Sequence, residues 1–323
     1  MILFILKQSY SYDQPGQISN GLFTSAGFVV DMLLMQGYQA RLEVAVDGNS
    51  IDRIVTKYKP SLVVLEALWV TPEKMAQLLK LHPKVRWTIR IHSEIPFLAN
   101  EGISVEWIAA YMKIGVTVGF NSEETARDFE LIGPAVYLPN YYPIRKMRRR
   151  PQSTPGILNV GCFGAIRPLK NQLIQAFAAA TFVRGTGKKL RFHMNGSRPE
   201  QGGNNNLKSI VALMEATKNE LVLHPWLDHE DFLDLIWSMD ICLQVSFTES
   251  FNITSADAVS MGVPLVGSEA IRWLPAQTQA DVNDVNSIVT LMAQAGSSTV
   301  MLNHVALENY IADVASTWDE FVG

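Results

Sequence analysis

Apolar and polar segments alternate along the whole chain, and their lengths predict strands followed by helices. The first apolar run, Met1 to Leu6, is interrupted by Lys7 after six residues, as in a short buried strand. A polar stretch with two glycines follows, and then a helical periodicity that Gly37 ends. Further strand-like runs lie at residues 61–66, 85–92, 115–120 and 135–139, with helix-length segments between them. This alternation predicts a parallel sheet covered by helices.

The same alternation restarts after residue 156, so a second α/β domain is expected. Between the two halves the chain is rich in proline and basic residues, which is typical of a linker. Residues 200–206, rich in Gly and Asn, are predicted to form a surface loop. The predicted boundaries are residues 1–140 for the first domain, 141–156 for the linker, 157–305 for the second domain, and 306–323 for a C-terminal helix packing back toward the first.

Composition narrows the classes of protein. A chain of 323 residues with 48% hydrophobic content can form two cores, and its net charge of -4 argues against binding nucleic acid through bulk charge. The basic run at residues 145–150 favours a solvated linker over a phosphate or membrane contact. No stretch is apolar for long enough to span a bilayer, so a cytoplasmic protein is expected, with at most peripheral membrane contact. Cys162 and Cys242 are expected to be buried, reduced thiols.

Charged residues gather at the predicted carboxyl ends of strands. Glu249 and Asp257 stand on either side of one strand-to-helix turn, where unpaired backbone N–H groups favour an anionic ligand. Arg167 and Lys170 follow the first strand of the second domain and enter a helix, where two cations can neutralise a diphosphate. His92 ends a strand of the first domain. These features together predict a nucleotide-diphosphate ligand between the two domains.

Residues 157–275 resemble the nucleotide-binding domain of GT-B-fold retaining glycosyltransferases of the glycogen-synthase-like and sucrose-synthase-like family. Val160-Gly161 precedes Arg167 and Lys170-Asn171 in the order that the family has. The family's Glu-x7-Glu motif corresponds to Glu249 and Asp257, and Met261-Gly262-Val263-Pro264 follows as in the family. Residues 1–139 match by architecture only. The resemblance implies an α/β GT-B fold, with two Rossmann-like doubly wound domains facing each other across a cleft.

The resemblance also implies roles for individual residues. Arg167 and Lys170 would hold the diphosphate, Glu249 and His92 would contact the transferred sugar, and Asp257 would accept hydrogen bonds from the ribose. These first four form the implied catalytic set. The implied donor-binding set is Gly16, Gln17, Asn195, Trp226, Ser250, Phe251, Asn252, Ile253 and Asp257.

The implied reaction is transfer of a sugar, with retention of configuration, from a nucleotide sugar to an acceptor hydroxyl, with a glycan as the expected acceptor. A UDP-linked donor is favoured by its frequency in the family, and no metal or other cofactor is expected. Two residues depart from the family pattern, because Ser250 and Asn252 stand where glycines are usual. Three alternatives stay open: a transferase acting on a modified DNA base, a sugar-nucleotide epimerase, and a non-catalytic nucleotide-binding partner subunit.

Overall fold

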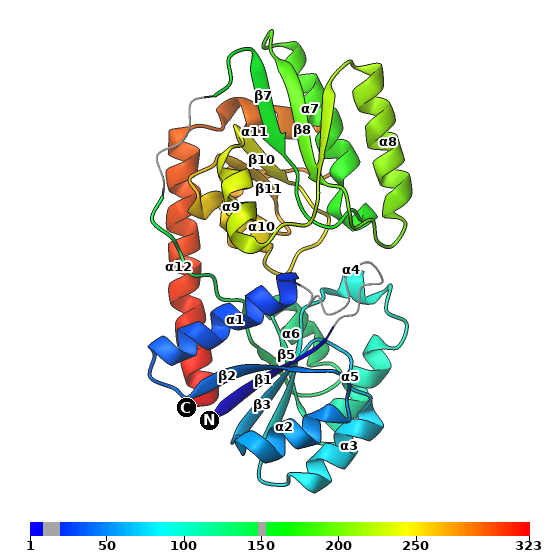
Figure 1. Ribbon diagram of the computed structural model, residues 1–323, viewed down its shortest axis with the longest axis vertical. Coiled ribbons are helices and arrows are strands. Elements are labelled where there is room, and N and C mark those ends of the chain that lie inside the picture. Colours follow the sequence, from blue (N-terminus) through cyan, green and yellow to red (C-terminus); the bar gives the residue numbers. More distant parts are fainter. Residues whose placement is uncertain (9–19, 148–152) are drawn as a thin grey trace. The chain divides into compact units, whose positions relative to one another are not determined.

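The protein folds into two compact units, each built around one six-stranded parallel sheet (Figure 1). The computed structural model describes residues 1–8, 20–147 and 153–323. Residues Met1–Pro143 and Ile311–Gly323 form the first unit, and Ile144–Tyr310 form the second.

The first sheet has the strand order β2-β1-β3-β4-β5-β6, and every pair of neighbours is parallel. Its strands are β1 (Ile2–Lys7), β2 (Ala40–Ala45), β3 (Leu62–Glu66), β4 (Arg86–Ile91), β5 (Thr117–Phe120) and β6 (Ala135–Tyr137). The sequence pattern did not reveal β2, an edge strand with one buried residue, Ala45. Charged Arg41 and Glu43 interrupt its apolar character.

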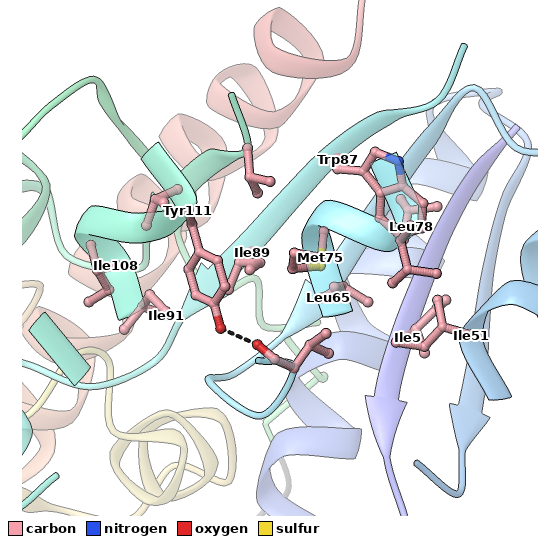
Figure 2. Close-up of a cluster of buried hydrophobic side chains, with 14 of the residues drawn as sticks. Ile5, Ile51, Leu65, Met75, Leu78, Trp87, Ile89, Ile91, Ile108 and Tyr111 are labelled. Atoms are coloured by element: carbon pink, nitrogen blue, oxygen red, sulfur yellow. Dashed lines mark hydrogen bonds between the residues drawn. The ribbon is translucent and has the colours of Figure 1, made fainter. Parts of the chain in front are cut away.

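Helices α2, α3 and α5 bury their apolar side chains against the first sheet (Figure 2). The helices of this unit are α1 (Asn20–Met35), α2 (Ser50–Tyr58), α3 (Pro72–Leu81), α4 (Ile95–Leu98), α5 (Ser104–Lys113) and α6 (Glu123–Phe129). Helix α3 begins at the Thr71-Pro72 pair that the sequence indicates, and the Thr71 side chain accepts a hydrogen bond from Lys74 N at 3.3 Å. In the core, the Tyr111 hydroxyl donates to the Val70 carbonyl, and burial raises the pKa of Tyr111.

The last residues of the chain pack against the first sheet. Helix α12 (Ser297–Val322) carries Trp318, which is fully buried and donates from Nε1 to the Pro139 carbonyl at 2.9 Å. Its ring lies 5.7 Å from that of Phe4 in β1. Tyr38 adds an outer contact, since its hydroxyl donates to Asp319 Oδ1 at 2.7 Å. The C-terminal residues of α12 therefore form part of the first unit's core.

The second sheet has the order β12-β11-β10-β7-β8-β9, again wholly parallel. Its strands are β7 (Ile157–Gly161), β8 (Lys189–Asn195), β9 (Glu220–His224), β10 (Ile241–Gln244), β11 (Leu265–Ser268) and β12 (Gln279–Ala280). The first strand, β7, lies in the middle, and the chain order runs outward from it in both directions. The boundary between β7 and β10 is the topological switch point, where ligands of such sheets bind.

The helices of the second unit form two groups, in which α7 contacts α8 and α11, and α9 contacts α10. They are α7 (Gln172–Arg184), α8 (Gly203–Ala216), α9 (His229–Trp237), α10 (Ile253–Ser260) and α11 (Val285–Gln294). Residues 297–310 of α12 also belong to this unit. The loop predicted over residues 200–206 is wrong in its second half, because α8 starts at Gly203. A Cβ at Gly203 would come within 1.9 Å of the Ile166 carbonyl oxygen, so this glycine permits a close approach of two backbones.

Over the described parts of the chain, no helix is both long and apolar enough to cross a membrane.

Candidate active site

The loop after β7 and the turn after β10 meet at the switch point of the second sheet. Lys170 Nζ lies 2.5 Å from Glu249 Oε1, and the Lys170 and Glu249 side chains are 22% and 8% exposed. Parallel strands bring their carboxyl ends to the same edge of a sheet, so the 79 positions between the two residues become one contact. Both residues belong to the site predicted from the sequence, but their pairing was not predicted.

Side-chain amides fix the backbone around Lys170. Gln175 donates from Nε2 to the Lys170 carbonyl at 2.8 Å and accepts from Val245 N at 2.9 Å. Asn171 has a left-handed backbone, with a φ of 56°, and donates from Nδ2 to the Val245 carbonyl at 3.1 Å. Hydrogen bonds therefore hold the loop that carries Lys170 against the end of β10.

Arg167, also in the loop after β7, is held by Glu200. Arg167 Nε donates to Glu200 Oε2 at 2.7 Å, and Arg198 donates to Glu200 Oε1 at 2.5 Å. The Arg198 guanidinium in turn lies 4.6 Å from the centroid of the Trp226 ring. Two residues of the predicted site, Arg167 and Trp226, are thus connected through two residues that the sequence analysis did not select.

Asp257 lies in α10 and is fully buried. Its Oδ1 is 2.8 Å from Nε2 of His229, the first residue of α9. Burial lowers the pKa of His229, but the hydrogen bond and charge of Asp257 outweigh burial and raise the pKa overall. His229 was not predicted from the sequence, since nothing in its spacing relates it to a carboxylate 28 positions later.

The structure explains why asparagine can occupy position 252. Asn252 is the N-cap of α10 and has a left-handed backbone with a φ of 63°, a conformation that glycine adopts freely and asparagine tolerates best among other residues. Its Oδ1 accepts from Ser255 N at 2.9 Å, and its Nδ2 donates to Gln244 Oε1 at 3.0 Å. The side chain is therefore used inside the protein, and the residue is only 8% exposed.

The remaining predicted donor residues of this turn divide between core and surface. Phe251 is buried, with its ring 5.2 Å from that of Tyr310, and its carbonyl accepts from Trp273 Nε1 at 2.8 Å. Phe251 is therefore part of the core, and its side chain is not available to a ligand. Ser250 and Ile253 are partly exposed on either side of Phe251.

Asn195 ends β8, is buried, and accepts from Gly164 N at 2.8 Å through Oδ1, so it shapes the loop after β7. Beside it lies a stacked histidine pair, in which His193 Nδ1 is 2.9 Å from His224 Nε2. Burial, with the neighbouring His224, lowers the pKa of His193 to about 4. His193 is therefore neutral at pH 7.

In the first unit, His92 joins a buried charge cluster at the ends of β3 and β4. Glu66 and Arg90 are cross-strand partners and fully buried, with Arg90 Nη1 3.2 Å from Glu66 Oε2. His92 Nε2 contacts the same carboxylate oxygen, and Asn121 Nδ2 lies 3.2 Å from His92 Nδ1. Burial raises the pKa of Glu66, but the charges of Arg90 and His92 outweigh it and lower the pKa. Burial lowers the pKa of His92.

The two other donor residues assigned to the first domain, Gly16 and Gln17, lie outside the described residues. Among the described residues, no group of three or more His, Cys, Asp or Glu side chains could hold a metal ion. Cys162 and Cys242 are buried and unbonded to one another, and burial raises the pKa of the Cys162 thiol.

A basic pocket of about 550 Å³ lies at the amino ends of the second unit's strands, away from the switch point. Its cationic lining consists of Arg184, Lys188, Lys189 and Lys218. Arg184 lies in the last turn of α7, and Lys218 follows the end of α8, where cations offset the partial negative charge of a helix end. Helix stabilisation therefore accounts for Arg184 and Lys218 without a ligand.

Comparisons with known proteins agree with the sheet topology. The family model described as "Family 4 Glycosyltransferase in conflict systems" matches residues 108–318, more than half of the chain. No curated protein matches the sequence.

Solved structures share the fold at low sequence identity. Sucrose-phosphate synthase from Thermosynechococcus elongatus superposes with a TM-score of 0.73 at 11% identity, over 100% of this chain and 98% of that one. HepE from Anabaena, in complex with UDP and glucose, gives a TM-score of 0.66 at 15% identity, over 99% and 98% of the two chains. Trehalose-6-phosphate synthase from Burkholderia multivorans gives a TM-score of 0.61 at 14% identity, over 85% of this chain and 72% of that one.

Proposed function

Since the chain belongs to the family 4 glycosyltransferases of conflict systems, we propose that this enzyme moves a sugar from a UDP-linked donor to an acceptor hydroxyl with retention of configuration. Its fold is of the GT-B type, with a Rossmann-like sheet in each unit. The solved complexes of HepE with UDP, and with UDP and glucose, support UDP as the nucleotide. A glycan is the proposed acceptor.

The Lys170–Glu249 contact at the switch point is the observation that carries this proposal. It places a cation and a carboxylate side by side where a nucleotide would bind a doubly wound sheet. In the proposed complex, Lys170 moves its charge to the diphosphate, and Glu249 is released to accept hydrogen bonds from the sugar. A sugar diphosphate supplies both an anion and hydroxyl donors, so it satisfies both groups.

Arg167 is the second proposed diphosphate ligand. Together with Lys170 it offsets the charge that develops on the leaving UDP as the glycosidic bond breaks, which lowers the barrier to transfer. The leaving phosphate oxygen then accepts the proton of the attacking acceptor hydroxyl, which approaches from the same face. Both cations come from the loop after β7, whose backbone is fixed by Gln172 and Gln175.

Asp257 is the proposed ribose ligand, and His229 orients its carboxylate through the 2.8 Å contact. His92 is proposed to contact the transferred sugar from the first unit. Both of its ring nitrogens have partners, Glu66 and Asn121, which fix the orientation of the ring. A sugar hydroxyl that bonds the ring would replace Asn121 at Nδ1, while Glu66 on Nε2 keeps the tautomer and the orientation of the ring.

No described residue favours a DNA-base acceptor over a glycan. Arg145, the first residue of the basic run, forms a two-bond ion pair with Glu230, at 2.8 and 2.5 Å. The arginines at 148–150 lie outside the described residues.

A thermal-shift panel of UDP, GDP, ADP and TDP sugars tests the donor. A ligand that binds only the native state and is present at a concentration of about 100 times its Kd stabilises that state by about 2.7 kcal/mol. A selective donor therefore raises the Tm measurably. The proposal expects the largest shift with a UDP-sugar. A shift with GDP- or ADP-sugars and none with UDP-sugars would show that the nucleotide is assigned wrongly.

A further inference from the structure

Glu200 is the residue at which two arginines of the second unit converge. Each of its carboxylate oxygens accepts from a different guanidinium, Oε2 from Arg167 and Oε1 from Arg198. The Arg167 Nη2 to Glu200 Oε2 distance is 2.5 Å, as is that from Arg198 Nη2 to Oε1. All three side chains are partly buried or half-exposed, so solvent and a ligand can reach them.

The backbone sets this convergence. Ile166 N donates to the Arg198 carbonyl at 2.9 Å, and Glu200 N donates to the Ile166 carbonyl at 2.9 Å. A short parallel bridge, Ile166 to Pro199, thus joins the loop after β7 to the segment after β8. Gly203 completes the junction by bringing the start of α8 against the Ile166 carbonyl. The three side chains meet because hydrogen bonds join the backbone segments that carry them.

The charges leave this junction with a net excess of one positive charge. Burial raises the pKa of Glu200, but Arg167 and Arg198 outweigh burial and lower it, so the carboxylate is ionised at neutral pH. A guanidinium fork binds carboxylate and phosphate oxygens in similar geometry. A phosphate with two or more charges would therefore compete with Glu200 for the same donors.

We propose that Arg198 is a third cation of the donor site and that Glu200 holds Arg167 and Arg198 in place until the donor's diphosphate replaces it. This inference rests on the proposed function, since it assumes that Arg167 meets a diphosphate. It adds to that function a residue from the segment after β8. It also gives the site an internal anion that weak phosphate ligands must displace.

Trp226 strengthens the assignment. The Arg198 guanidinium lies 4.6 Å from the centroid of the Trp226 ring, a distance at which cation and ring attract one another. The aromatic ring therefore limits where Arg198 can move when Glu200 is displaced. A ring beside a cation pair also matches the chemistry of a nucleoside diphosphate, which carries a base next to two phosphates.

Isothermal titration with UDP and with pyrophosphate tests the inference on the full-length protein. Glu200→Gln keeps the shape of the side chain and removes the competing charge, so it lowers the Kd for both ligands about two- to fivefold, as expected for a partly exposed ion pair. Arg198→Gln removes a charged donor and raises both Kd values about tenfold. When Arg198→Gln is already present, Glu200→Gln lowers the Kd by a smaller factor than it does in the wild type. Only one of the two arginines, Arg167, is then left to be released from Glu200.

Glu220→Gln is the matched control. Glu220 pairs with Arg191 at 2.6 Å on the same sheet, between β8 and β9 and away from the switch point. This variant leaves both Kd values unchanged. Circular dichroism at 25 °C checks that each variant is folded.

The outcomes separate this inference from the function on which it rests. Weaker UDP binding in Lys170→Ala with unchanged binding in Arg198→Gln and Glu200→Gln would overturn the inference alone. Tighter binding in Glu220→Gln, or weaker binding in Glu200→Gln, would also overturn it. If wild-type protein binds pyrophosphate through Arg198 but does not bind UDP, the UDP donor is wrong and the arginine pair is still an anion site. Binding of neither ligand would overturn both.

Discussion

Lys170 Nζ and Glu249 Oε1 lie 2.5 Å apart, although 79 positions separate the two residues in the sequence. The contact joins the loop after β7 to the turn after β10, at the point where the strand order of the second sheet reverses. Each group neutralises the other. A ligand that carries phosphates and hydroxyls can take over both partners, which is why the contact is informative about function.

Asn252 provides a test of the local backbone. Asn252→Gly keeps the left-handed conformation without strain. Asn252→Ala keeps a Cβ there but loses the local hydrogen bonds that help asparagine tolerate this conformation, at a cost of about 1–2 kcal/mol relative to glycine. Both variants lose the hydrogen bonds to Gln244 and Ser255. Urea unfolding should therefore show Asn252→Ala to be less stable than Asn252→Gly by about 1–2 kcal/mol. Equal free energies of unfolding would contradict the backbone explanation.

The buried Glu66–Arg90 pair predicts a large loss of stability when one partner is removed. Glu66→Ala leaves Arg90 buried with an uncompensated charge, which costs about 3–5 kcal/mol of unfolding free energy. The control is Glu43→Ala, which breaks the exposed pair with Arg41 and costs under about 1 kcal/mol. Chemical denaturation of both variants gives the comparison. A loss below about 1 kcal/mol in Glu66→Ala would show that the pair contributes little.

His193 predicts how stability depends on pH. Its pKa is about 4 in the folded protein, against about 6.5 in an unfolded chain. Between these values the unfolded state binds the proton and the folded state does not, so the free energy of unfolding falls as the pH falls. In total, His193 lowers the free energy of unfolding by roughly 3 kcal/mol between pH 6.5 and 4. Above pH 7 it causes no pH dependence. His193→Gln should therefore show a shallower pH dependence. The same slope in both proteins would exclude His193 as the cause.

Much of the fold follows from local sequence. Runs such as residues 61–66 and 241–245 are buried strands because parallel sheets cover both faces of a strand. Thr71-Pro72 and Asn121-Ser122 indicate helix starts through their own capping chemistry. The edge strand β2 and the beginning of α8 were harder to predict, because the first has little burial and the second starts with glycine and asparagines.

The residues of the candidate site could be selected from the sequence only one by one. Arg167, Lys170, Glu249 and Asp257 could be selected because each follows a strand or enters a helix in a recognisable order. Their partners could not, because the pairing of Arg167 with Glu200 and of Asp257 with His229 depends on tertiary contacts. Conversely, Asn252 stands where glycine is usual, and its backbone φ of 63° supplies a physical reason for that restricted choice.

The rate of UDP release from the UDP-sugar that stabilises the protein most, measured with a glycan acceptor mixture, tests the central claim most directly. Lys170→Ala removes one cation from the leaving diphosphate, which should lower kcat about 10²- to 10³-fold while the circular dichroism spectrum is unchanged. Lys208→Ala, an exposed lysine on α8, is the matched control and should keep the wild-type rate. A Lys170→Ala rate within about twofold of wild type would contradict the assignment of this lysine to the donor diphosphate.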